Sequence, residues 1–181
     1  AVPLRQAIGR VSAELVAPYP PGIPVVADTL EATHLDPACL ALEITEGTLM
    51  QTTDEVAVNL REILHLGVRF SIDDFGTHYS SFAYLKRFRV HTLKIDRSFV
   101  AGVLDATGDA EIVRAMASLG RNLGIEVVAE GVETTDQLEF LRGTGAHACQ
   151  GYLFGKPLPA EAFGALLANA APPDAPRRHR A

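Results

Sequence analysis

The sequence predicts an α/β fold, and within that class a TIM-like (β/α) barrel that is incomplete at its N-terminal end. Three observations predict it. Amphipathic helices alternate with short aliphatic strands, each strand carries apolar residues on one face, and polar residues stand at the strand ends. The alternation implies right-handed crossovers and a parallel sheet. Polar groups gathered at one mouth favour a barrel over an open doubly wound sheet, which buries apolar residues on both strand faces.

Three helices are predicted, each followed by a strand. Thr52 and Glu55 have the spacing of a capping box, which marks the start of the first helix. Glycines are expected to end the helices, because glycine adopts positive φ without steric cost. The apolar stripes are Val56, Leu60, Ile63 and Leu64, then Ile112, Met116, Leu119 and Leu123, then Leu138 and Leu141 after Thr135, and they stop at Gly67, at Gly124, and at Gly143 and Gly145.

Five strands are predicted, and a sixth candidate lies near residues 4–11. The five lie near residues 40–44, 68–73, 91–95, 125–129 and 146–149. A complete barrel takes about 250 residues, and this chain of 181 residues is short by roughly two strands at its front. We expect a piece of a longer chain, with a barrel domain over 1–170, a disordered Pro- and Arg-rich tail over 171–181, and a Pro-rich loop over 18–24.

Composition excludes several classes of protein. The chain has 16 Lys and Arg against 22 Asp and Glu, a net charge of −6, so it lacks the basic surface that a nucleic-acid polymer requires. Its two cysteines, Cys39 and Cys149, form no CxxC pair, which argues against a disulfide framework or a thiolate zinc site and favours the cytoplasm. No apolar run is long enough to span a bilayer, and membrane attachment through another part of the parent chain stays open.

Polar residues collect at the predicted strand ends. They are Glu43, Glu46, Asp73, Asp74, Lys94, Glu130 and Gln150. Each acid alone is more often a helix cap or a surface charge. Together, however, two carboxylates about 4 Å apart repel by roughly 4 kcal/mol at an effective dielectric constant near 20, so some must be protonated or divalent cations must join them. All-oxygen ligands suit Mg²⁺ or Mn²⁺, and adjacent acids allow one carboxylate to bridge two ions.

Five ordered motifs carry a family resemblance over roughly residues 3–168. They are Leu42-Glu43-Ile44-Thr45-Glu46, Asp73-Asp74-Phe75-Gly76-Thr77, Leu93-Lys94-Ile95-Asp96, Val128-Ala129-Glu130-Gly131-Val132-Glu133 and Gln150-Gly151-Tyr152-Leu153. In order and separation they resemble the motifs of EAL-domain cyclic-di-GMP phosphodiesterases. The resemblance implies a barrel that hydrolyses cyclic-di-GMP to linear pGpG with two Mg²⁺ or Mn²⁺ ions.

The same resemblance implies a role for each strand-end residue. Glu43, Asp73, Asp74 and Glu130 would ligate metal, with Asp73 bridging the two ions. Lys94 would orient water or balance charge, Glu130 would lie beside the attacking water, and Gln150 would hold the site or the substrate. Glu46 would brace the loop 74–81, which in this family links metal occupancy to dimer contacts. A GGDEF or sensor domain elsewhere in the parent chain stays open.

Two departures from the family pattern weaken the enzymatic interpretation. The Glu-Ala-Leu motif is absent, and Gly9-Arg10-Val11-Ser12 stands where the family has a metal-binding Asn. His78 also replaces the usual glycine of the loop. Two hypotheses therefore remain: a phosphodiesterase whose activity is weak or absent in this chain alone, and a degenerate domain that binds cyclic-di-GMP or a protein partner without cleavage.

Overall fold

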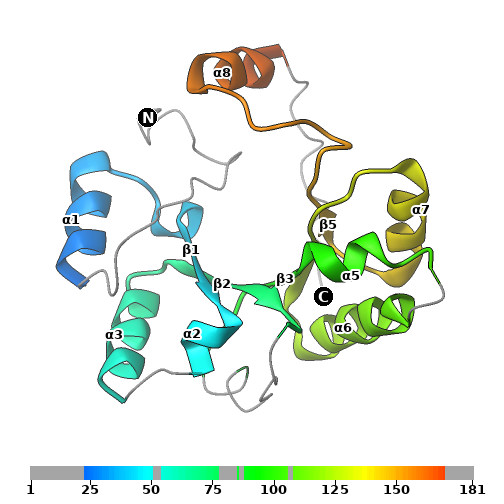
Figure 1. Ribbon diagram of the computed structural model, residues 1–181. Coiled ribbons are helices and arrows are strands. Elements are labelled where there is room, and N and C mark those ends of the chain that lie inside the picture. Colours follow the sequence, from blue (N-terminus) through cyan, green and yellow to red (C-terminus); the bar gives the residue numbers. More distant parts are fainter. Residues whose placement is uncertain (1–22, 51–53, 78–84, 86–87, 106–107, 170–181) are drawn as a thin grey trace, which may run out of the picture.

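Helices and short strands alternate along the chain in the computed structural model (Figure 1). The structure describes residues 23–50, 54–77, 85, 88–105 and 108–169. The elements are α1 (Ile23–Thr33), the 3-10 helix η2 (Pro37–Cys39), β1 (Ala41–Thr45), α2 (Glu46–Met50), α3 (Asp54–His65), β2 (Arg69–Phe75), β3 (Thr92–Ile95), α5 (Arg97–Ala101), α6 (Asp109–Leu123), β4 (Glu126–Ala129), α7 (Thr135–Thr144), β5 (Ala148–Cys149) and α8 (Ala160–Asn169).

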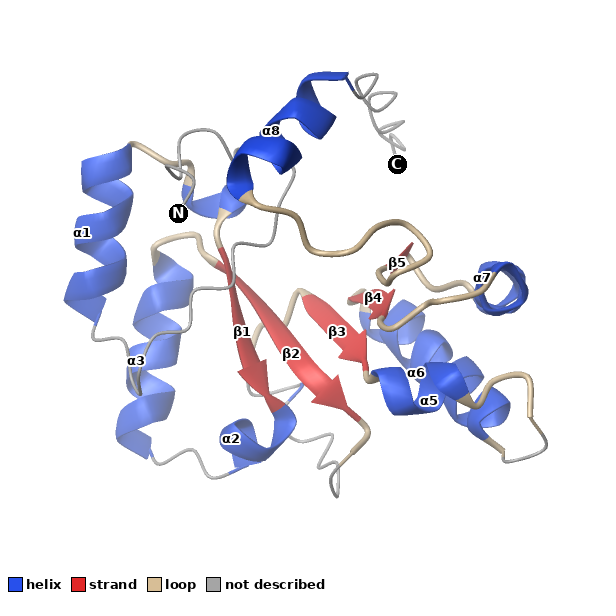
Figure 2. Cartoon of the chain, turned by 45° about the horizontal axis from the view of Figure 1, so that its top comes forward, coloured by secondary structure: helices blue, strands red, loops and turns tan. Residues whose placement is uncertain are grey.

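The five strands form one parallel sheet in the order β1-β2-β3-β4-β5. The arrows of β1, β2 and β3 in Figure 2 run the same way, and β4 and β5 continue the parallel pairing, so the carboxyl ends of the strands share one edge of the sheet. Sequential order is the winding of a (β/α) barrel, whereas a doubly wound sheet reverses its order at a switch point. The predicted fold class and the five strands are confirmed. The sixth candidate near 4–11, Thr52 of the capping box and the tail 171–181 lie outside the described residues.

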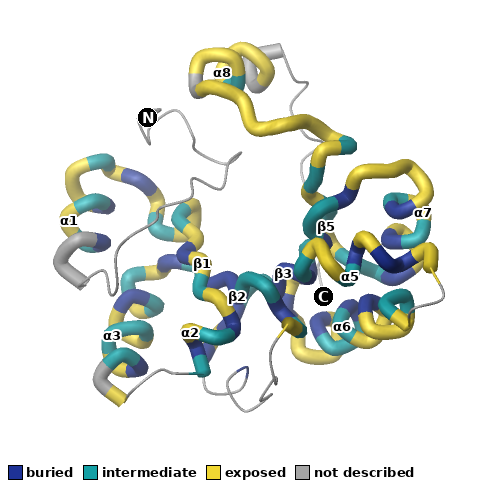
Figure 3. Tube along the Cα trace, in the orientation of Figure 1, coloured by how far each residue is buried: buried dark blue, intermediate teal, exposed yellow. Residues whose placement is uncertain are grey.

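The core lies between the sheet and its helices. Ile72, Leu93 and Val127 point to this side and are almost fully buried, as the alternation of apolar residues predicts. Figure 3 shows the buried side of α3 and α6 turned toward the strands, whereas α8 is largely exposed. The predicted helices are present as α3, α6 and α7, and Gly67, Gly124 and Gly145 adopt positive φ behind them.

One element was predicted incorrectly. The Pro-rich segment 18–24 was expected to be a loop. Residues 18–22 lie outside the described residues, but α1 begins at Ile23 and includes Pro24 in its first turn. Proline is tolerated there because the first helical N–H groups have no partner within the helix. The apolar face of α1 explains why the helix forms, since Val26 and Leu30 are buried against Leu42, Ile63 and neighbouring core residues.

Two histidines at the amino edge of the sheet form the same pair of hydrogen bonds to the adjacent strand. The Nδ1 atom of His91 accepts a hydrogen bond from the Phe70 N–H at 3.1 Å, and the His91 N–H donates to the Phe70 carbonyl at 2.9 Å. His147 repeats both bonds on Val127 at 3.0 and 2.8 Å. An Nδ1 atom that accepts a hydrogen bond carries no proton. Burial, helped by Arg69 and Arg89, lowers the pKa of His91 and favours this neutral form.

Acidification should weaken the fold through His91. Because the pKa of His91 is lower in the folded state, its stabilisation is present above the ordinary value near 6.5 and is lost as the pH falls through the folded value. We expect unfolding free energies of His91→Gln to fall less between pH 7 and pH 5 than those of the wild type, by about 1 kcal/mol. His65→Gln, at an exposed position, should keep the wild-type slope. Equal slopes for His91→Gln and the wild type would contradict the role of His91.

Candidate active site at the carboxyl edge of the sheet

Three carboxylates from three strands converge on one lysine. The Nζ atom of Lys94, in β3, lies 2.8 Å from Oε2 of Glu43, 3.1 Å from Oδ1 of Asp73 and 2.8 Å from Oε1 of Glu130. Glu43 belongs to β1, Asp73 to β2, and Glu130 directly follows β4. These acids are separated by up to 87 positions in the sequence, and the parallel register brings them together.

The charges of this cluster do not balance. Burial disfavours the ammonium of Lys94, but the hydrogen bonds that it donates to Glu130 and Glu43 outweigh that cost and raise the pKa of Lys94 above its usual value. For Glu130 burial dominates, and its pKa is raised even though Lys94 opposes the shift. The charges of Asp73 and Glu43 add a smaller rise to the pKa of Glu130, since three carboxylates share the one positive charge of Lys94.

A bulge in β2 brings the adjacent acids Asp73 and Asp74 to the same edge. Ile72 pairs with Leu93 and Phe75 pairs with Ile95, so β2 has one extra residue opposite Lys94. Simple alternation would place Asp74 on the helix side, but it adopts a φ of 53° and its carboxyl group hydrogen-bonds that of Asp96. Bulges beside functional sites commonly redirect side chains in this way.

Asp74 and Asp96 form a second acidic pair next to the cluster. Burial raises the pKa of Asp74, and the charges of Asp73 and Asp96 raise it further. Burial acts against the charged form of Asp96 too, but hydrogen bonds from Ser98 and the backbone lower its pKa. The two carboxyl groups are thus shifted in opposite directions, so Asp74 holds a proton more readily than Asp96 does. Asp96 was not among the predicted site residues, although its place two residues after Lys94, directly after the same strand, was a usable signal.

Glu46 supports the turn that follows β2. Its Oε2 atom accepts a hydrogen bond from the Gly76 N–H at 2.9 Å, and the residue is only 4% exposed. Gly76 has a φ of 97°, and a Cβ there would come within 2.1 Å of the Met116 side chain. The loop expected to rest on Glu46 is described only as far as Thr77, and His78 lies outside the described residues.

Gln150 lies apart from the cluster around Lys94. Among the described residues, the structure shows no hydrogen bond from its side chain to the cluster. It lies directly after β5 and is exposed. Its backbone N–H donates to the Ala129 carbonyl, and its carbonyl accepts a hydrogen bond from the Val132 N–H. Gly151 fixes this approach, since a Cβ there would collide with the backbone of Val132. Gln150 therefore lies at the same edge of the sheet, two strands away from Lys94.

The donors suit a divalent cation in type but do not form a finished metal centre. Asp73 Oδ1 is buried and has the ion pair with Lys94 but no well-directed hydrogen bond, so it can accept a further partner. Oxygen donors with excess negative charge suit Mg²⁺ or Mn²⁺. Within the described ranges, however, no three His, Cys, Asp or Glu side chains are placed to hold a metal ion. The oxygens surround an ammonium instead.

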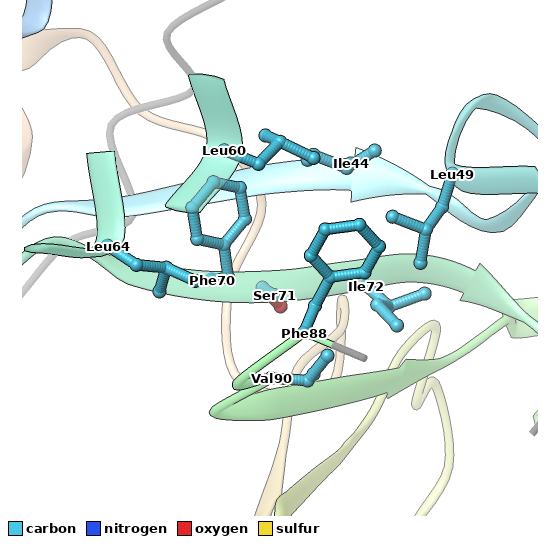
Figure 4. A pocket seen from close by; sticks show the side chains of 9 residues that line it. All are labelled: Ile44, Leu49, Leu60, Leu64, Phe70, Ser71, Ile72, Phe88 and Val90. Atoms are coloured by element: carbon cyan, nitrogen blue, oxygen red, sulfur yellow. The ribbon is translucent and has the colours of Figure 1, made fainter. Parts of the chain in front are cut away.

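The hollow shown in Figure 4 is not a competing site. It lies between β1, β2 and α3 on the helix side of the sheet, and it has a volume of about 10 Å³. Its lining is apolar except for Ser71, as Figure 4 shows. A hollow of this size holds at most about one water molecule, and a ligand would find almost no polar partners there.

Comparison with known proteins identifies the family. The EAL domain model matches residues 22–157, three quarters of the chain. The chain belongs to the EAL domain family. A model of the Orn/Lys/Arg decarboxylase C-terminal domain also matches residues 1–36, most of which lie outside the described part. The resemblance drawn from the five motifs is therefore confirmed.

Relatives and solved structures of the EAL family cover most of this chain. It is 47% identical to the bifunctional diguanylate cyclase/cyclic di-GMP phosphodiesterase MucR of Pseudomonas aeruginosa over 79% of its length, and 45% identical to the cyclic di-GMP phosphodiesterase NbdA of the same organism over 82%. It spans only 21% and 19% of these two proteins.

Two solved structures share the fold of this chain. The MucR phosphodiesterase in complex with c-di-GMP has a TM-score of 0.74 at 46% identity, and the match covers 78% of this chain and 57% of that one. Klebsiella pneumoniae BlrP1 in complex with manganese and c-di-GMP at pH 9.0 has a TM-score of 0.70 at 32% identity, with coverages of 75% and 34%. The TIM-like fold predicted from the sequence is thus confirmed, and the five described strands are part of such a barrel.

Removal of the Glu46 carboxylate should loosen the turn after β2. Glu46→Ala leaves the Gly76 N–H without its acceptor, so we expect a loss of about 1–3 kcal/mol in unfolding free energy. Glu46→Gln keeps an acceptor oxygen and should lose less. Glu62→Ala, exposed on α3, should change stability by no more than about 0.5 kcal/mol. Denaturant unfolding measures all three, and equal effects of Glu46→Ala and Glu62→Ala would contradict the bracing role.

Neutralisation of Glu130 should stabilise the fold at neutral pH. Because its folded pKa is raised, the contribution of Glu130 to stability is fully present below the ordinary value and is lost as the pH rises through the folded value. Glu130→Gln should therefore melt at a higher temperature than the wild type at pH 7, and the gain should vanish near pH 4.

Glu126→Gln is the matched control for this measurement. Glu126 begins the same strand at its other end and forms an exposed ion pair with Arg69. Exposed pairs contribute little, so this variant should gain nothing at pH 7. A melting temperature of Glu130→Gln below that of the wild type at pH 7 would show that Glu130 stabilises the fold as an anion.

Proposed function

We propose that this chain is part of a metal-dependent phosphodiesterase that hydrolyses cyclic-di-GMP to linear pGpG. The observation that carries the proposal is the convergence of Glu43, Asp73 and Glu130 on Lys94 at the carboxyl edge of the sheet. Catalytic groups of (β/α) barrels lie at this edge. The relatives support the substrate, since MucR is named a cyclic di-GMP phosphodiesterase and its solved phosphodiesterase contains c-di-GMP.

The negative charge of the site explains why such a reaction needs cations. Each phosphodiester of cyclic-di-GMP is an anion, and an edge rich in carboxylates repels it. We assign Glu43, Asp73, Asp74 and Glu130 as the ligands of Mg²⁺ or Mn²⁺, and BlrP1 with manganese supports the choice of a divalent ion. When bound, such ions stabilise charge on phosphate oxygens and lower the pKa of water.

The other groups handle protons and orientation. Hydrolysis adds water across one phosphorus–oxygen ester bond, so a proton leaves the water and the departing oxygen gains one. Glu130, whose pKa burial raises, is suited to accept the proton of the water. Lys94 stays an ammonium because its pKa is raised, and it orients water and balances negative charge. Gln150, exposed at the same edge, contacts the substrate.

A second function is favoured by one specific observation. The described residues form no metal centre of three side chains, and Lys94 neutralises part of the charge that a metal would neutralise. A domain that keeps Lys94 among the carboxylates and binds no metal would bind cyclic-di-GMP without cleaving it. Alternatively, it would bind a protein partner through the loop 74–81. Arg10, which stands in place of a metal-binding Asn, agrees with this alternative but lies outside the described residues.

The wider setting follows from the same family assignment. A second copy of the chain would pack through the region of loop 74–81, and a GGDEF or sensor domain would lie elsewhere in the parent chain. MucR, named as both cyclase and phosphodiesterase, supports the GGDEF neighbour. No helix within the described ranges is both long and apolar enough to cross a membrane. The cytoplasmic location rests on the cysteine usage, and a barrel over 1–170 with a tail over 171–181 remains a prediction.

Product analysis tests the function directly. The chain, extended upstream by the segment that MucR carries before the matched region, is incubated with cyclic-di-GMP and Mn²⁺, and pGpG is separated by chromatography. We expect turnover by the extended chain and little or none by the 181 residues alone. Glu130→Gln in the extended chain should still bind cyclic-di-GMP but should lose at least about 100-fold in turnover, the usual contribution of a general base.

Glu126→Gln serves as the control in the extended chain, because it alters an acid at the opposite end of the same strand. It should turn over substrate at the wild-type rate. If the extended wild-type chain binds cyclic-di-GMP but forms no pGpG, the phosphodiesterase is rejected and the non-catalytic binding domain is supported. Absence of both binding and turnover would reject both functions.

A further inference from the structure

The position of Lys94 is that of a cation inside a cluster of oxygen donors. Its Nζ atom has one carboxylate oxygen from each of Glu43, Asp73 and Glu130 within 3.1 Å. Surface lysines usually meet one acid and point to solvent, whereas the side chain of Lys94 is only 10% exposed. The three acids come from different strands, so the ammonium joins β1, β2, β3 and the end of β4 at a single point.

We infer that Lys94 is a displaceable placeholder: its ammonium holds the three carboxylates together in the metal-free protein and must withdraw when a divalent cation enters. The inference rests on the proposed metal-dependent function and concerns the state of the site before loading. It assigns Lys94 a positioning role toward Glu43, Asp73 and Glu130 that is separate from any part in the reaction.

Geometry makes the ammonium and the metal mutually exclusive at this point. The Nζ–oxygen distances of 2.8–3.1 Å are hydrogen-bond lengths, whereas Mg²⁺ binds oxygen at about 2.0–2.1 Å. A metal held by any two of these oxygens would draw them closer together than the ammonium does and would leave no room for Nζ between them. Only the side chain can move, because Leu93 and Ile95 on either side of Lys94 are 1% and 0% exposed and fix β3 in the core.

Charge favours the exchange. Three carboxylates around one ammonium keep excess negative charge, and Asp73 Oδ1 is buried without a well-directed hydrogen bond. A divalent ion doubles the attraction of each carboxylate at a given distance. The opposing cost is that Lys94 must give up these three contacts and move aside within the edge, where its ammonium can still contact water. Lys94 thus keeps the three carboxylates in place for the metal and also competes with it. Because this competition weakens metal binding, occupancy of the site depends on the free concentration of the metal.

Thermal unfolding with and without MgCl₂ tests this placeholder role. Lys94→Met removes the ammonium and keeps an unbranched apolar side chain, and Lys156→Met, at an exposed position, is the matched control. Without metal, Lys94→Met should melt roughly 5 °C or more below the wild type, because the carboxylates then repel one another. Millimolar MgCl₂ should restore most of this loss, with an apparent affinity roughly tenfold or more above that of the wild type. Lys156→Met should match the wild type in both conditions.

A second measurement follows the wild-type chain itself and uses a variant only to assign the signal. The chain has only three lysines, Lys86, Lys94 and Lys156, so its ¹⁵N-detected ammonium spectrum is simple. One slowly exchanging ammonium signal, absent from Lys94→Gln, should be present without metal and disappear as MgCl₂ saturates the site. Retention of that signal at saturation, or failure of MgCl₂ to rescue Lys94→Met, would overturn the proposal. If MgCl₂ restores the melting temperature of Lys94→Met but the extended chain does not hydrolyse cyclic-di-GMP, only the proposed function is overturned.

Discussion

The ion cluster at Lys94 is the interaction on which the active edge depends. Parallel strands place their carboxyl ends side by side, and this fold brings the acids of β1, β2 and β4 to one place. Carboxylates so close are unstable together unless a cation joins them. The buried ammonium of Lys94 provides the positive charge in this structure, and it does so from the central strand of the sheet.

The strands that carry the site are tightly packed in β3 and β4, whereas the backbone of β2 is irregular at the same edge. Leu93, Ile95, Val127 and Ala129 fix the middle strands in the core with almost no exposure. The bulge of β2 and the positive φ of Asp74 depart from regular strand geometry at the same edge. Such irregularities persist where surrounding contacts hold them, and here the Glu46–Gly76 hydrogen bond is one such contact.

Local rules made much of the fold predictable from the sequence. The stripe that ends at Gly124 predicted α6 and the glycine stop, and the alternation in β2 predicted which residues face the core. Helix α1 was missed because Pro24 and the prolines before the helix favoured a loop, while its stability comes from burial of Val26 and Leu30 against distant residues. At the site, the gathering of acids was predictable from strand parity. The bulge, the Asp74–Asp96 pair and the central place of Lys94 were not, because they depend on register and side-chain torsions.

A crystal structure of the chain grown without divalent cations would show whether the ammonium of Lys94 holds the three acids together. We expect Lys94 Nζ to lie within about 3 Å of one oxygen from each of Glu43, Asp73 and Glu130, the range of charge-assisted hydrogen bonds. An ammonium turned into solvent, with the three carboxylates pointing away from one another, would contradict it.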